Sequence, residues 1–268
     1  MNFSKNHLRD KANSHDFRLF RRTVFKEYAT FIKDSIQSNY DWSVKFIMWL
    51  RQYLHYIMYE KKFRPTMLPR YSRGQILLVN FGFRIGNELG GPHYAIVLDN
   101  DNRKKDGLIT VVPMISKKPR HEARDLCPWE YELPFPISHL ILIKASKKLS
   151  TEPNSELVAE VIASANELLK YEPAKQMELI PSFLEQFEKN LQGKIAPLVA
   201  LAKKMQKGSI VDTRQVASVS KQRIIVPANR ADELYDVIIP ESVLAQICDK
   251  IKNTYMQAGS LDESGEKL

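Results

Sequence analysis

The sequence has little cysteine, because Cys127 and Cys248 are the only two among its 268 residues. Two cysteines build neither a disulfide framework nor a four-cysteine zinc site, and this usage is typical of a reducing compartment. Long hydrophobic runs are also missing, since Arg51 and His55 interrupt the most apolar stretch, residues 44–59. The first residues are too polar for a signal peptide. We therefore expect a cytoplasmic protein without a membrane-spanning segment.

Glycine is absent from the first 70 residues, and proline does not occur there before Pro65. The same segment holds 14 of the 26 aromatic residues, and its 14 Lys and Arg against 6 Asp and Glu give a net charge of +8. The whole chain carries +9, so almost all of the net positive charge lies in this quarter of the sequence. Such a composition favours helices with a basic surface.

Apolar residues recur at spacings of three and four over residues 17–32 and again over 42–57. This spacing predicts two amphipathic helices, and residues 1–68 are expected to form a basic, aromatic-rich helical hairpin. Asp41 or Ser43 would cap the second helix, and Pro65 with Pro69 would close it. The aromatic side chains either pack the helices onto the rest of the protein or, with the basic residues, bind nucleic acid, an acidic partner or a membrane surface.

From Tyr71 onward, short β-like runs separated by turn residues predict an α+β domain over residues 69–268. Helices are expected over 155–171 and 182–206, within an insertion at about 150–207, and over 240–256. A disordered tail is expected from about residue 258. The predicted strands are QILLVNFGF, HYAIVLD, LITVVPM, HLILIKA, SIVDTRQVASV and QRIIV.

Three segments occur in an order that resembles the PemK/MazF family of toxin endoribonucleases. They are RGQILLVNFGFRIGNELGGPHYAIVLDND (73–101), ITVVPMISKK (109–118) and DTRQVASVSKQRI (212–224), and the resemblance covers residues 71–118 and 209–226. It implies an SH3-like β-barrel core with a few helices, usually in a homodimer. Relatives in this family cut single-stranded RNA without a metal or other cofactor and are silenced by an antitoxin protein.

Metal-free RNA cleavage needs a group that takes the 2′-hydroxyl proton, donors that stabilise charge on the phosphate, and a proton for the leaving 5′-oxygen. The family's Arg after the Gly-Gly loop aligns with His93, and its Thr at the strand end aligns with Ile115. An imidazole can accept and donate a proton near neutral pH. Ile115 cannot donate a hydrogen bond and is the better core residue, so we expect Ser116 to point to the surface. The predicted catalytic residues are therefore His93 and Ser116.

Polar and charged residues near these motifs are candidates for contacts with RNA, because Lys and Arg bind phosphates without reading sequence. Each of them can equally be an ordinary solvated charge. Glu88 has two interpretations, an acceptor for the amides of the glycine-rich loop or an orienting partner for His93. The spacing of His121, Cys127 and His139 is too irregular to predict a metal site. The predicted RNA-binding residues are Arg84, Glu88, Lys117, Lys118, Gln215, Lys221 and Arg223, and Arg214 is a further candidate for a phosphate contact.

Two functions from different classes remain open on the sequence. The first is a toxin endoribonuclease that cleaves single-stranded RNA through attack by the 2′-hydroxyl. The second is a catalytically inactive PemK/MazF-like module that binds nucleic acid or an antitoxin-like protein. The departures at His93 and Ile115, together with the added basic helices, favour the second.

Overall fold

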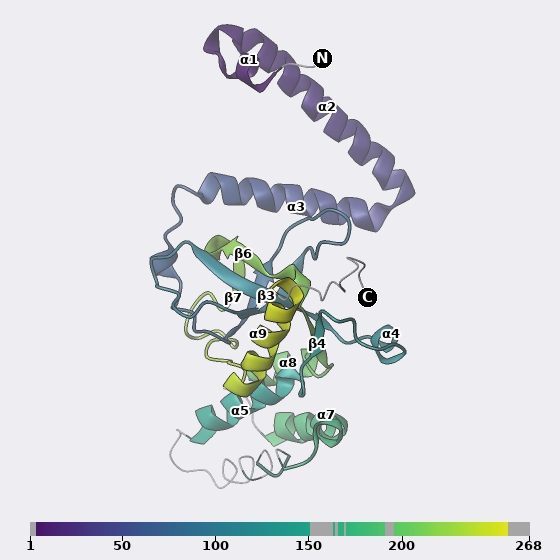
Figure 1. Ribbon diagram of the computed structural model, residues 1–268, viewed down its shortest axis with the longest axis vertical. Coiled ribbons are helices and arrows are strands. Elements are labelled where there is room, and N and C mark those ends of the chain that lie inside the picture. The colour runs from purple at the N-terminus through teal and green to yellow at the C-terminus, as the bar shows by residue number, and fades with distance from the viewer. Residues whose placement is uncertain (1–3, 151–162, 164–165, 169, 191–195, 257–268) are drawn as a thin grey trace, which may run out of the picture. The chain divides into compact units, whose positions relative to one another are not determined.

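The computed structural model describes residues 4–150, 163, 166–168, 170–190 and 196–256 (Figure 1). The chain divides into two compact units, Met1–Lys61 and Lys62–Leu268. Within the described residues, no helix is long and apolar enough to cross a membrane. The expected tail from residue 258 and most of the expected helix over 155–171 lie outside the described residues.

The first unit consists of α1 (Lys5–Arg9), the short 3-10 helix η1 (Lys11–Asn13), α2 (Ser14–Ser38) and α3 (Tyr40–Tyr59). Asn39 alone separates α2 from α3, and its side-chain carbonyl accepts a hydrogen bond of 3.1 Å from the Trp42 backbone N–H. The cap of α3 is therefore Asn39, and the predicted caps Asp41 and Ser43 were wrong. Both predicted residues lie inside the helix, where their backbone is already helical.

Helices α2 and α3 contact each other near their joint and diverge from it (Figure 1). Phe31 packs edge-on against Trp42 and Phe46, with ring centroids 5.5 and 6.0 Å apart, and the Ser43 hydroxyl donates to that of Ser35 at 2.9 Å. Many of the remaining apolar side chains stay exposed. They are Phe17, Phe25, Tyr28, Ile36, Val44, Ile47, Met48, Tyr53, Leu54, Ile57 and Met58.

The second unit is built on an antiparallel sheet in the order β4-β5-β3-β2-β1-β7, with β6 also pairing with β3. The 3-10 helix η3 (Thr213–Gln215) interrupts the predicted strand SIVDTRQVASV, so its two halves, β5 and β6, pair with successive parts of β3. The strands are β1 (Ile76–Asn80), β2 (Pro92–Val97), β3 (Leu108–Ser116), β4 (Glu130–Glu132), β5 (Ser209–Asp212), β6 (Ala217–Ser220) and β7 (Ile224–Val226).

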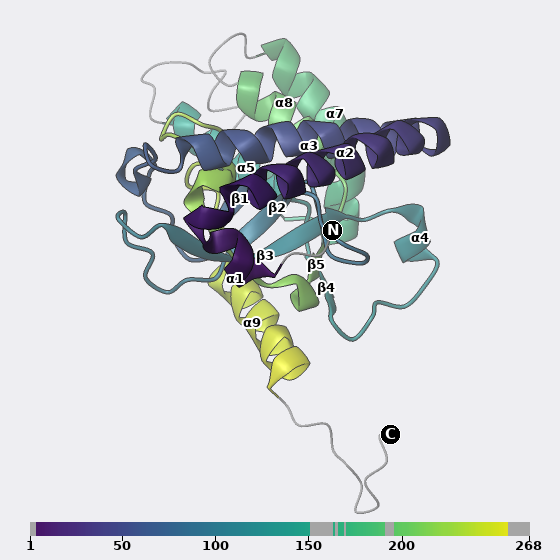
Figure 2. The same ribbon diagram turned by 90° about the horizontal axis from the view of Figure 1, so that it is seen from above.

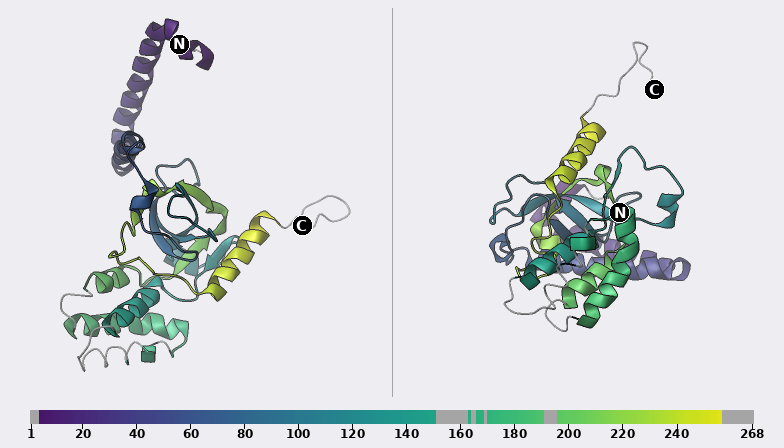
Figure 3. Two further views of the ribbon diagram at one scale, coloured as in Figure 1. Left: turned by 90° about the vertical axis from the view of Figure 1, so that its left-hand side faces the viewer. Right: turned by 90° about the horizontal axis from the view of Figure 1, so that it is seen from below.

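Backbone ladders alone leave this sheet open, so they do not form the closed barrel that the family resemblance implies. One further connection between strands is made by the chain itself. The 3-10 helix η4 (Lys221–Arg223) joins β6 to β7, and β7 pairs with β1. Strands β1, β2, β3, β6 and β7 therefore follow one another around a ring with four ladders and one chain connection (Figure 3).

Both faces of the central strands are buried, which explains their nearly continuous apolar sequence. On β1, Leu77 and Val79 face one core while Ile76 and Leu78 face the other, as the two-residue period of a strand requires. The inner core, between the strands of the ring, consists of Tyr71, Leu77, Val79, Phe81, Ala95, Val97, Ile109, Val111, Val219 and Ile224. The outer core joins Ile76, Ile96, Val112 and Met114 to residues of the helices.

Helices α5, α7 and α8 lie together beside the sheet (Figures 1 and 2), and α9 packs on the outer core through Val243, Leu244 and Ile247. Two short helices, η2 and α4, complete the described elements. The bounds are η2 (Pro65–Met67), α4 (Pro119–Glu122), α5 (Ile137–Ser150), α7 (Pro173–Asn190), α8 (Ala196–Lys204) and α9 (Glu241–Tyr255).

The segment HLILIKA, predicted as a strand, is part of helix α5, so that prediction was wrong. Ile137, Ile141 and Ala145 recur every four residues and are all buried, which is the pattern of a helix face. A short apolar run does not distinguish these states unless the residues around it are included. The predicted helix over 182–206 is two helices, and the first begins at Pro173 and contains Pro181. The helix predicted over 240–256 is confirmed as α9.

Candidate nucleic-acid site at the glycine-rich loop

The loop between β1 and β2 is closed at its base by two backbone hydrogen bonds. Phe81 N–H donates to the Gly91 carbonyl at 2.9 Å, and Gly91 N–H donates to the Gly82 carbonyl at 2.7 Å. A Cβ atom on Gly90 would lie 2.8 Å from the Gly82 carbonyl oxygen, and Gly91 has a φ of +82°. The glycine pair is therefore required by a close backbone approach and by a left-handed conformation.

Two arginine side chains meet at the base of this loop. The Arg84 Nε donates to the Phe81 carbonyl at 3.2 Å, and an Nη of Arg223 donates to the same oxygen at 3.1 Å. Glu88 forms an ion pair with Arg84 at 3.8 Å, which neither interpretation of Glu88 anticipated. Two guanidinium groups held side by side are suited to bind an anion such as phosphate, because each presents a planar set of donors.

His93 lies near the start of β2, directly opposite Val79 of β1. Partial burial lowers the pKa of His93 below its usual value of 6.5. Hydrogen bonds to the backbone of Met114 and Gly90 act against this shift, and the nearby Lys118 ammonium group lowers the pKa further. The imidazole is therefore mainly neutral at neutral pH and can accept a proton.

The side chains of His93 and Ser116 lie on opposite faces of the sheet. His93 shares its face with Ala95, which is paired with Pro113, so the corresponding residue near the end of β3 is Ile115. Ser116 shares its face with Met114 of the outer core. Ser116 is exposed and Ile115 partly buried, as predicted, but the structure does not bring the Ser116 hydroxyl onto the face of His93.

The other predicted RNA-binding residues have different surroundings. The side-chain carbonyl of Gln215 accepts from Leu89 N–H and its amide donates to the Asn87 carbonyl, both at 3.2 Å, so Gln215 fixes the glycine-rich loop. Lys117 forms an ion pair of 2.7 Å with Glu132, and Lys118 is exposed.

The prediction that Lys221 binds RNA was wrong. Its side chain is 0 % exposed, and its Nζ donates to the Arg103 carbonyl at 2.9 Å. The Nζ also lies 5.9 Å from the centre of the Tyr71 ring, and burial lowers the pKa of Lys221. The turn η4 directs this residue inward, and a run such as KQR does not reveal which member of a 3-10 turn points to the core.

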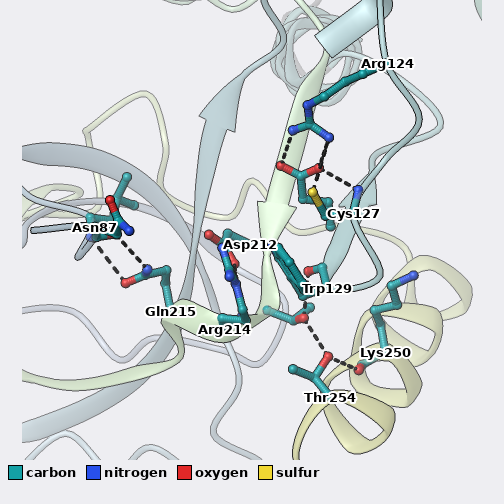
Figure 4. Close-up of polar contacts among 12 residues, drawn as sticks. Asn87, Arg124, Cys127, Trp129, Asp212, Arg214, Gln215, Lys250 and Thr254 are labelled. Atoms are coloured by element: carbon teal, nitrogen blue, oxygen red, sulfur yellow. Dashed lines mark hydrogen bonds and ion pairs between the residues drawn. The ribbon is translucent and has the colours of Figure 1, made fainter. Parts of the chain in front are cut away.

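Sequence reasoning missed a second loop, residues 117–129, that is held by a buried carboxylate (Figure 4). Both terminal nitrogens of Arg124 donate to the two oxygens of Glu130 at 2.8 Å, and Cys127 N–H donates to Glu130 at 2.9 Å. These contacts lower the pKa of Glu130 to about 2, with the Arg124 hydrogen bonds as the largest cause. No sequence pattern indicated this pairing, because residues six apart are not in contact within one helix or one strand.

Among the residues that the structure describes, no group of three or more His, Cys, Asp and Glu side chains gathers where it could hold a metal ion. Two of the histidines considered above have other partners. His121 accepts a hydrogen bond from Lys118 N–H at 3.0 Å, and the Nδ1 of His139 lies 2.7 Å from the side-chain oxygen of Gln176.

Comparison with known proteins bears on the second unit. Residues 72–166 match the family model described as PemK-like, MazF-like toxin of type II toxin-antitoxin system. Among solved structures, the crystal structure of MazF (Form-I) from Deinococcus radiodurans matches with a TM-score of 0.33 and 15% sequence identity, over 70% of this chain and 99% of that chain. No curated protein matches the sequence. The family resemblance read from the first two motifs is thus confirmed over residues 72–166, which match the PemK-like, MazF-like toxin model.

Proposed function

We propose that this protein is the toxin of a type II toxin-antitoxin system and cleaves single-stranded RNA without a metal ion. The observation that carries the proposal is that the base of the glycine-rich loop holds both a pair of arginines, Arg84 and Arg223 on the Phe81 carbonyl, and, through a hydrogen bond to the Gly90 backbone, the imidazole of His93. The family match over residues 72–166 includes this loop and His93. These groups supply a neutral base and an anion-binding pair, which are two of the requirements for attack by a 2′-hydroxyl.

In the proposed reaction, His93 takes the proton of the 2′-hydroxyl while that oxygen forms a bond to phosphorus. The bond from phosphorus to the 5′-oxygen breaks, the leaving oxygen takes a proton from solvent water, and protonated His93 then returns its proton to solvent. Arg84 and Arg223 stabilise the negative charge that grows on the phosphoryl oxygens. The products carry a 2′,3′-cyclic phosphate and a 5′-hydroxyl, and Lys118 contributes to holding the RNA backbone.

The proposal extends to architecture and partners. The ring of β1, β2, β3, β6 and β7, closed through η4, fits the SH3-like barrel of the family. By the same analogy we propose a cytoplasmic homodimer that is silenced by an antitoxin protein. Selectivity for an RNA sequence or context belongs to the surface around residues 81–91 and 117–129.

The test is cleavage of a long single-stranded RNA by purified protein in EDTA, with His139→Ala as the matched control for His93→Ala. Both histidines are half-buried and have lowered pKa values, but His139 lies on α5 beside Gln176. We expect cleavage by the wild type and His139→Ala, and a loss of about 100-fold or more in His93→Ala. Equal activity of the two variants would contradict the assignment of His93.

The second candidate function is a binding module without catalysis. The observation that favours it is Ile115, which stands where the family has a hydroxyl, while Ser116 points from the opposite face. Such a module would bind single-stranded RNA with an affinity that falls steeply with salt, and would release no cyclic-phosphate product. Unchanged RNA after prolonged incubation, together with salt-sensitive binding, would favour this candidate over the nuclease.

A further inference from the structure

The three residues of η3 hold three separate elements together (Figure 4). Thr213 is fully buried, and both its backbone N–H and its hydroxyl donate to the Trp129 carbonyl, at 3.0 and 2.7 Å. Its hydroxyl also lies 3.0 Å from that of Thr254 on α9. Trp129 is followed directly by Glu130, which Arg124 fixes. The backbone is therefore fixed by Thr213 at Trp129 and by the Arg124 contact with the residue that follows it.

Arg214 stacks on this ring. Its guanidinium carbon lies 3.6 Å from the centre of the Trp129 ring system, and its Nε lies 3.6 Å from the Asp212 carboxylate. The Asp212 carboxylate also accepts a hydrogen bond of 3.1 Å from the Arg214 backbone N–H. Even so, 47 % of the Arg214 side chain is exposed. A long side chain that is both oriented and exposed has lost much of its conformational entropy before any ligand binds.

The stacked pair of Trp129 and Arg214 lies next to the proposed cleavage site. Gln215, the residue after Arg214, holds the glycine-rich loop through Asn87 and Leu89. On the other side, the exposed ring of Tyr255 at the end of α9 is within electrostatic range of Asp212 and Arg214. The stacked side chains of Trp129 and Arg214 thus adjoin the loop at which RNA is proposed to bind.

The charge balance favours a base over a phosphate as the occupant. Asp212 offsets the charge of Arg214 and would repel a phosphate, whereas a neutral nucleobase meets no such repulsion. Unpaired bases of single-stranded RNA stack on aromatic rings and on Arg guanidinium planes. The outer plane of Arg214, backed by Trp129, offers that surface.

We propose that the Trp129–Arg214 stack is a platform for one nucleobase of the bound single-stranded RNA, beside the loop that Gln215 anchors. This inference rests on the proposed function, because it needs an RNA strand at the glycine-rich loop. It assigns to Trp129 and Arg214 the recognition of a base, and to Asp212 the orientation of the guanidinium group.

The test is the affinity of the full-length protein for a short single-stranded RNA made uncleavable by 2′-O-methyl groups, compared with the same strand made abasic. Arg214→Lys keeps the charge but loses the plane, so we expect it to weaken binding of the normal strand at least about fivefold. We expect no difference from wild type on the abasic strand. Arg230→Lys, at an exposed arginine between β7 and α9, is the matched control and should leave both affinities unchanged.

Tryptophan fluorescence gives a second readout. In a chain with Trp42→Phe and Trp49→Phe, Trp129 is the only tryptophan, and binding of the normal strand should quench it more than binding of the abasic strand. Binding that Arg214→Lys does not weaken, with no base-dependent quenching, would overturn the platform and leave the proposed function standing. A wild-type protein that binds no single-stranded RNA at low salt would overturn both.

Discussion

The two units of the chain use apolar side chains in opposite ways. In Lys62–Leu268 these residues alternate along strands and fill two cores, one inside the ring of strands and one under the helices. In Met1–Lys61 the only described residues classed as buried are Ser35 and Ser43, while rings such as Phe25 are 68 % exposed. Regular spacing of apolar residues therefore predicts the type of element in both units but does not predict that its apolar face is covered.

Net charge does not distinguish the unit that holds the proposed site. Met1–Lys61 has 11 Lys and Arg against 6 Asp and Glu, a net charge of +5, and Lys62–Leu268 carries the other +4 of the chain's +9, whereas all the residues of the proposed site lie in the second unit. In the second unit, buried hydrogen bonds fix the site, as Gln215 and Arg124 illustrate. The proposed site is therefore marked by its local contacts and not by the net charge of the unit that holds it.

The largest expected effect comes from replacing one isoleucine by alanine in each unit and comparing the two changes in stability. Ile96 is 0 % exposed in the outer core and Ile36 is 46 % exposed on α2. Ile96→Ala should lower the free energy of unfolding by about 2–5 kcal/mol, because it leaves a cavity. Ile36→Ala should change it by less than about 0.5 kcal/mol. Urea unfolding measures both, and a large effect of Ile36→Ala would mean that α2 is covered in solution.

Two ion pairs sharpen the contrast. Only 8 % of the Glu130 side chain is exposed, whereas the Asp41–Lys45 pair on α3 is open to solvent. Glu130→Gln should lower the free energy of unfolding by about 2 kcal/mol, because it weakens charged hydrogen bonds. Asp41→Asn should leave it almost unchanged. The pKa of Glu130 is about 2 in the folded protein and 4.5 in the unfolded chain. Its contribution to the free energy of unfolding is therefore present above pH 4.5 and is lost as the pH falls toward 2. Between pH 4.5 and 2, the free energy of unfolding should fall less steeply in Glu130→Gln than in the wild type.

Within the second unit, two glycines distinguish a constrained loop from an ordinary one. Gly90→Ala should displace the backbone of the glycine-rich loop and cost about 1–3 kcal/mol, because its Cβ would lie 2.8 Å from the Gly82 oxygen. Gly107→Ala is the matched control, since the nearest atom to its Cβ is 4.0 Å away. Thermal unfolding and RNA cleavage should both be impaired in Gly90→Ala alone. Equal behaviour of the two variants would contradict the close approach of the loop ends.

The smallest effect concerns two lysines of the second unit that the sequence does not distinguish. Lys118→Met should reduce the slope of log affinity for RNA against log salt by about one, because an exposed phosphate contact is lost. Lys221→Met should leave that slope unchanged, since its Nζ is buried against the Arg103 carbonyl. Binding of uncleavable RNA over a series of salt concentrations measures both. A reduced slope in Lys221→Met would contradict its buried position.

Much of the fold could be predicted from the sequence. Strands β1, β2 and β3 and helices α2, α3 and α9 follow from hydrophobic periods that tertiary contacts reinforce. Helix α5 was misread because HLILIKA is short and apolar, and its helical spacing appears only when Ile137 is included. The strand predicted through residues 209–219 was interrupted because Asp212 caps the turn η3.

The site was predicted less well, because it depends on the directions of side chains. His93 lies beside the glycine-rich loop because it follows Gly91 by two residues, but the opposite facing of Ser116 depends on sheet register. The inward direction of Lys221 and the clamp formed by Gln215 arise from 3-10 turns and from contacts over more than 100 residues. Local patterns contain no information on such distant partners.

The most direct test of the central claim is the rate of single-turnover RNA cleavage in EDTA as a function of pH, with chemical analysis of the fragment ends. We predict 2′,3′-cyclic phosphate and 5′-hydroxyl ends, and a rate that rises with pH through an apparent pKa below 6.5, because burial lowers the pKa of the base His93. His93→Ala should abolish that acidic limb. Intact RNA, cleavage only after a divalent metal is added, or an unchanged pH profile in His93→Ala would contradict the account.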